Sequence, residues 1–132
     1  MLGPATARTK GNPVSAFLDN LEKAISTHDL DALVSCFTED YRCDMPTHPA
    51  RGFVGQNVVR ENWTGLFARV PDIEARVLRS VQDGDAVWSE WEMAGTTVEG
   101  TPFLVKGVVI ARTEGDRAAQ ANFYLDPVEQ NS

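Results

Sequence analysis

The chain has 132 residues, of which 42% are hydrophobic and 23% are charged, as is typical of one globular domain. Its 12 basic and 19 acidic residues give a net charge of −7, which argues against nucleic acid or an anionic membrane as a partner, because both call for clustered Lys and Arg. No apolar run is long enough to span a membrane and residues 1–12 contain no apolar block, so we expect a cytoplasmic protein.

The N-terminal half predicts helices. We expect residues 1–12 to form a flexible tail, residues 13–127 one domain, and residues 128–132 a second tail. Asn12 is a suitable N-cap and Pro13 a suitable first helical residue. The first helix then has an apolar stripe at helical spacing. That stripe consists of Val14, Phe17, Leu18, Leu21 and Ile25.

Two further helices are expected. A short one begins at Asp29, a good N-cap, and its apolar face extends to Phe37, with residues 38–40 ending it. A third follows Gly55, carries apolar residues on one face and ends before Pro71. That face consists of Val59, Trp63, Leu66, Phe67 and Val70.

The rest of the chain predicts strands. Apolar alternation and turn signals indicate strands over 41–45, 51–54, 73–81, 86–97, 103–111 and 118–125. Helices followed by antiparallel strands indicate an α+β fold. We expect the sheet to curl over the helices and to enclose a pocket.

The long strand 86–97 has two different faces. One face carries Val87, Ser89, Trp91 and Met93, and the other carries Trp88, Glu90 and Glu92. A tryptophan beside two glutamates on an outer face is typical of a contact between subunits. With Val108 and Ile110 on the same surface, the pattern predicts a homodimer.

The cysteines and histidines do not form a metal-binding pattern. Cys36 and Cys43 lie in apolar segments and are expected to be free, buried thiols. His28 and His48 are the only histidines, and neither stands at metal-ligand spacing from a cysteine. We therefore expect no metal and no organic cofactor.

Several short segments resemble one superfamily. The runs HDLDAL at 28–33 and FTED at 37–40, the loop MPTHPARG at 45–52, the segment 55–67, RTEGD at 112–116 and YLD at 124–126 occur in its order. They resemble the superfamily of SnoaL-like polyketide cyclases, ketosteroid isomerases and limonene epoxide hydrolases, which has the nuclear transport factor 2 fold. The resemblance implies a cone: a curved mixed β-sheet with three N-terminal helices enclosing an apolar pocket, often paired as a dimer.

The catalytic positions of two relatives are not matched. The base of ketosteroid isomerases falls on Met45, beside Asp44, and its oxyanion acid falls near Val109. The charged groups of limonene epoxide hydrolases fall on Trp91, Met93 and Phe123. The resemblance therefore implies no epoxide hydrolase activity here.

The register of the resemblance implies a largely apolar pocket. Its candidate substrate-binding residues are Phe17, Leu21, Cys43, Met45, Trp63, Trp91, Met93, Val109 and Phe123. The alternative is that these side chains only fill the core. A small apolar ligand or substrate suits such walls.

Three residues are candidates for catalysis. Asp44 at the end of a strand and His48 in the following loop form the one acid–base pair on offer, and Tyr41 is a candidate hydrogen-bond donor to a carbonyl oxygen. An exposed Asp, an exposed loop His and a half-buried Tyr are the structural alternatives. Two functions stay open: a cofactor-free isomerase, cyclase or dehydratase acting by proton transfer on an apolar carbonyl compound, and a non-catalytic module that binds a hydrophobic ligand or a protein.

Overall fold

The computed structural model describes residues 13–129, which form three α-helices and one six-stranded sheet. The predicted tail at 1–12 and residues 130–132 lie outside the described residues. The helices are α2 (Pro13–Ser26), α3 (Leu30–Val34) and α4 (Gln56–Arg69), with a 3-10 turn η1 (Pro49–Arg51). The strands are β1 (Phe37–Asp44), β2 (Phe53–Val54), β3 (Glu74–Asp83), β4 (Ala86–Thr96), β5 (Pro102–Glu114) and β6 (Arg117–Pro127).

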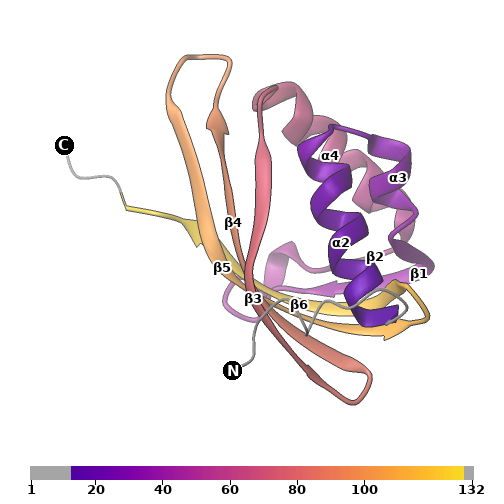
Figure 1. Cartoon of the computed structure of the whole chain (residues 1–132). Helices are drawn as coiled ribbons and strands as arrows, with labels where there is room; N and C mark the ends of the chain where they lie inside the picture. Colours follow the sequence, from indigo (N-terminus) through magenta and orange to yellow (C-terminus); the bar gives the residue numbers. More distant parts are fainter. Residues whose placement is uncertain (1–12, 130–132) are drawn as a thin grey trace.

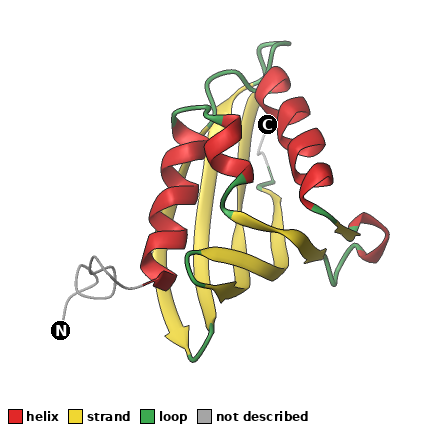
Figure 2. Cartoon of the chain, turned by 90° about the vertical axis from the view of Figure 1, so that its right-hand side faces the viewer, coloured by secondary structure: helices red, strands yellow, loops and turns green. Residues whose placement is uncertain are grey.

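The sheet is mixed and strongly curved. Its strand order is β2-β1-β6-β5-β4-β3. The strands β1 and β6 are parallel, and all other neighbours are antiparallel. Figure 1 shows the long strands bending around the helices, and Figure 2 shows all three helices on the same, concave face. This arrangement confirms the predicted α+β class and the cone.

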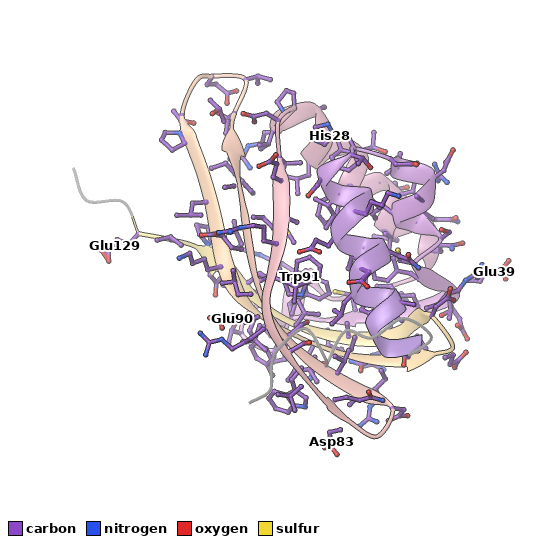
Figure 3. All side chains as sticks on the ribbon, viewed as in Figure 1. His28, Glu39, Asp83, Glu90, Trp91 and Glu129 are labelled. Atoms are coloured by element: carbon purple, nitrogen blue, oxygen red, sulfur yellow. The ribbon has the colours of Figure 1, made fainter. Side chains whose placement is uncertain are left out.

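The alternation predicted for β4 is confirmed. Val87, Ser89, Trp91 and Met93 are buried beneath the helices, whereas Trp88 is 49% exposed on the convex face. In Figure 3, Trp91 lies between the sheet and α2. Its indole Nε1–H donates to Ser89 Oγ at 2.8 Å, and that hydroxyl donates to the carbonyl oxygen of Val109 at 3.1 Å. The polar atoms at the centre of the core are therefore satisfied.

The second helix is shorter than its sequence pattern predicts. It ends at Val34, and residues 38–40 belong to β1 rather than to a helix end. The misleading signal is the spacing of Phe37 from Leu33 and Val34, because residues three and four apart share one face of a helix. Phe37 pairs with Ala118 of β6, and its ring packs edge-on against Phe17 of α2 at 6.1 Å. Because it pairs with β6, the segment that begins at Phe37 forms a strand and does not extend the helix.

His28 has a structural role at the connection between α2 and α3. Its φ of 60° allows the chain to reverse between α2 and α3. Its ring Nε2 is hydrogen-bonded to the carbonyl oxygen of Ile73 at 2.8 Å, and the ring packs against that of Phe67. The histidine thus links the helix connection to the start of β3.

Candidate functional site

A cavity of about 230 Å³ lies between α4 and the concave face of the sheet. The helix α2 packs over β3, and α3 packs against α2 and α4. The helix α4 packs against β1 and leaves this space beside it. The wall residues come from β1 and the residue that follows it, from β2 and α4, and from the strands β4–β6. They are Phe37, Tyr41, Cys43, Met45, Phe53, Val59, Asn62, Trp63, Leu66, Met93, Phe103, Val105, Phe123 and Leu125.

Charged groups are missing from this wall. Among the described residues that line the cavity there is no Asp, Glu, His, Lys or Arg. Such a wall offers water few hydrogen bonds, so transferring an apolar ligand into it is favourable. Burying a lone charge there is costly.

Tyr41 and Cys43 bring the polar atoms of β1 to the cavity. Both residues point to the concave face because they stand two apart in one strand. The Tyr41 ring is held between Phe37 at 4.6 Å and Phe53 at 6.1 Å, measured between ring centroids. Both side chains are buried, with Tyr41 1% exposed and Cys43 2% exposed.

Burial keeps both groups protonated. Desolvation raises the pKa of Tyr41 well above its ordinary value, and the neighbouring Cys43 and Asp44 raise it further. Desolvation likewise raises the pKa of Cys43 to about 11. At neutral pH the cavity therefore holds a phenol that donates a hydrogen bond and a thiol that is neither a base nor a nucleophile.

Five of the nine predicted substrate-binding residues line this cavity: Cys43, Met45, Trp63, Met93 and Phe123. The other four are buried outside its wall: Phe17, Leu21, Trp91 and Val109. These four lie where α2 packs directly on the sheet. The physical reason for the difference is the position of the helices, since α2 fills its half of the concave face and α4 does not.

Asp44 lies on the opposite side of the sheet from the cavity. It alternates with Cys43 and so projects from the convex face, where Arg42 Nε donates to its carboxylate at 3.1 Å. Gln120 Nε2 donates to the same carboxylate at 3.0 Å. Asp44 is therefore not the buried base that its apolar neighbours suggest.

His48 also lies away from the cavity wall. Its Nε2 faces Asp126 Oδ1 at 3.0 Å, and both side chains are substantially exposed. His48 and Asp44 are not bonded to each other: His48 pairs with Asp126, and Asp44 pairs with Arg42. Of the three candidate catalytic residues, only Tyr41 lines the cavity.

Sequence reasoning did not select Asn62 as a site residue. It lines the cavity from α4, three residues after Val59 and beside Trp63. The available signal was a polar residue at the edge of the apolar stripe of a helix, three residues after Val59. Phe37, Phe53, Phe103 and Leu125 were also missed as wall residues, because each was assigned only to a strand or a helix end.

Within residues 13–129, no group of three or more His, Cys, Asp or Glu side chains is arranged to hold a metal ion. None of the helices in that part of the chain combines the length and apolarity needed to cross a bilayer.

The sequence matches the SnoaL-like domain family over residues 14–121. No curated protein matches it. Among solved structures, it resembles wild-type IdmH from Streptomyces antibioticus, a candidate polyketide cyclase, with 22% identity over 87% of this chain and 92% of that chain and a TM-score of 0.73. A candidate isomerase from Bacillus subtilis aligns at 13% identity over 89% of both chains, with a TM-score of 0.78.

A third similar structure is a protein of Catenulispora acidiphila with a ketosteroid isomerase-like fold, in complex with trimethylamine. It shares 18% identity over 82% of this chain and 84% of that chain, with a TM-score of 0.71. At these identities the three structures establish the fold and leave the activity to be argued from the cavity.

Proposed function

Because this chain belongs to the SnoaL-like domain family, we propose that it binds a small apolar molecule in the cavity beside α4. The observation that carries the proposal is a cavity wall built from aromatic, aliphatic and sulfur-containing side chains, with no ionisable carboxylate, imidazole or amine among the described residues. Met45 and Met93 suit such a role, because methionine adapts its shape to a ligand.

The volume of the cavity limits the size of the ligand that it can hold. A dry cavity of roughly 150 Å³ accepts benzene. A cavity of about 230 Å³ therefore suits a compound of roughly ten non-hydrogen atoms, such as a two-ring aromatic or a small terpenoid. Each buried methylene contributes about 0.8 kcal/mol to binding.

Calorimetry with 2-acetonaphthone, an apolar two-ring ketone, tests the proposal. We expect saturable one-to-one binding with a negative heat-capacity change, as burial of apolar surface requires. The absence of binding to this ketone and to matched hydrocarbons would refute the proposal.

A second function is favoured by one observation, the presence of Tyr41 in the cavity wall. A phenol kept protonated by burial donates a hydrogen bond to a carbonyl oxygen. It would so stabilise the enolate of a cofactor-free isomerisation, dehydration or cyclisation in which a water molecule takes the α-proton, since the described wall holds no base. The likeness to IdmH agrees with such chemistry. The test is turnover of a β,γ-unsaturated cyclic ketone, which Tyr41→Phe should lower about 10²-fold.

The proposal extends to assembly and location. A homodimer formed through the convex face agrees with the exposure of Trp88 and Val81 there. A cytoplasmic location agrees with two free, buried cysteines.

A further inference from the structure

Asn62 is a polar residue at the edge of the inward face of α4. The inward stripe consists of Val59, Trp63 and Leu66 and continues to the C-cap Val70, at spacings of three and four. Asn62 follows Val59 by three residues and so lies on the same side of the helix. It lines the cavity while its side chain stays exposed, which places it at the rim.

The Asn62 amide has no partner among the described residues. Gln56 on the same helix shows the contrast, since its Nε2 donates to the carbonyl oxygens of Val34 at 3.0 Å and Phe37 at 2.9 Å. Gln56 is thus a structural amide that ties α4 to β1. Asn62 has two N–H donors and one acceptor oxygen that no described residue uses.

The other polar side chains of the wall are less accessible than Asn62. Tyr41 is 1% exposed and Cys43 is 2% exposed, within the aromatic cluster of β1 and β2, whereas Asn62 is exposed at the rim. Of the described polar wall residues, Asn62 is therefore the one most open to a ligand group that enters from the rim. An amide beside an apolar wall, with no protein partner among the described residues, is available to bond a polar group of a ligand.

We infer that Asn62 determines specificity, and that the ligand is an apolar ring compound with a neutral hydroxyl or carbonyl group that bonds to the Asn62 amide at the rim. The inference rests on the proposed binding function. The ligand group is neutral because no cation lies in the described wall to offset the desolvation of a carboxylate. The guanidinium of Arg69, two turns along α4, is stacked 5.8 Å from the centroid of the Phe103 ring.

Three ligands of matched size test the inference: 2-naphthol, 2-methylnaphthalene and 2-naphthoate. Their dissociation constants are measured by calorimetry at pH 7 for the unaltered protein, for Asn62→Leu and for Asn57→Leu. Asn57 is the matched control, because it is an exposed residue of the same type on α4 that does not line the cavity. Thermal unfolding of each variant shows whether it is folded.

We expect Asn62→Leu to weaken 2-naphthol binding roughly 2- to 10-fold, the worth of one hydrogen bond, and to leave 2-methylnaphthalene unchanged or tighter. Asn57→Leu should change neither ligand, and Asn62→Gln should restore part of the preference for 2-naphthol. An equal effect of Asn62→Leu on both ligands would overturn the inference, as would preferred binding of 2-naphthoate that depends on Arg69. Failure of all three ligands to bind the unaltered protein would instead refute the binding function itself.

Discussion

At the scale of single residues, Gly107 is a position where the sheet leaves no room for a side chain. It lies in β5 between Trp91 of β4 and Leu125 of β6. Its φ is 156°, and an added Cβ would overlap the carbonyl oxygen of Tyr124. Relief of this overlap requires movement of the backbone of β6, which is costly in a paired strand.

We predict that Gly107→Ala lowers the free energy of unfolding by at least about 2 kcal/mol. Gly65→Ala is the matched control. Gly65 is exposed within α4 with open space around it, so alanine there should raise the stability by up to about 1 kcal/mol. Urea denaturation measures both variants, and a Gly107→Ala protein as stable as the parent would contradict the account.

The two thiols make stability depend on pH in the alkaline range. Desolvation raises the pKa of Cys36 to about 12 and that of Cys43 to about 11, from an ordinary value of 9.0. The folded state therefore retains these protons over a range in which the unfolded state loses them. Their contribution to stability is present below pH 9 and is lost as the pH rises towards 11–12.

We predict that the Cys36→Ala, Cys43→Ala double variant loses less stability between pH 8 and about pH 10.5 than the parent does. Denaturation at a series of pH values measures the two slopes. Equal slopes would mean that the folded protein does not hold its thiols in their protonated form.

At the scale of elements, the sequence predicts which face of a strand is buried better than what covers that face. The alternation in β4 correctly places Trp91 and Met93 on the concave face. The alternation does not show that Trp91 lies in the core and Met93 in the cavity wall, because that difference depends on where α2 and α4 lie. Asp44 shows a related limit, since an apolar neighbourhood in sequence says nothing about the face from which a strand residue projects.

The strand β5 allows a prediction in which neighbouring residues have opposite effects. Val105 lines the cavity, whereas Leu104 is the adjacent residue on the other face. Val105→Trp should fill the cavity and weaken binding of 2-acetonaphthone at least about tenfold, because the ligand loses most of the apolar area that it buries. Leu104→Trp should leave the affinity unchanged. Calorimetry measures both variants, and an unchanged affinity in Val105→Trp would mean that the ligand binds outside the cavity.

At the scale of the whole molecule, the convex face of the sheet carries an apolar row across three strands. Val81, Trp88 and Ile110 are neighbours in register, and Val81 is 66% exposed. Ion pairs flank this row, with Arg79 Nε at 2.7 Å from Glu90 and Lys106 Nζ at 3.4 Å from Glu92. An apolar centre with a charged rim is the usual composition of a protein interface.

We predict that the protein in solution has twice the mass of the 14.5 kDa chain, and that Trp88→Glu returns it to the single-chain mass. Val98→Glu, an exposed apolar residue in the connection between β4 and β5, is the control and should leave the mass unchanged. Light scattering after size exclusion gives the masses. A parent protein of single-chain mass at micromolar concentration would refute the interface.

The central claim, that the cavity takes an apolar ligand, is tested most directly through the methionine methyl groups. Met45 and Met93 both line the cavity, and the ring current of a bound aromatic shifts nearby methyl signals. Titration of ¹³C-methyl-methionine protein with 2-acetonaphthone, with signals assigned by Met45→Leu and Met93→Leu, should move both resonances along one saturation curve. Saturable binding that leaves both resonances in place would put the ligand outside the cavity and contradict the account.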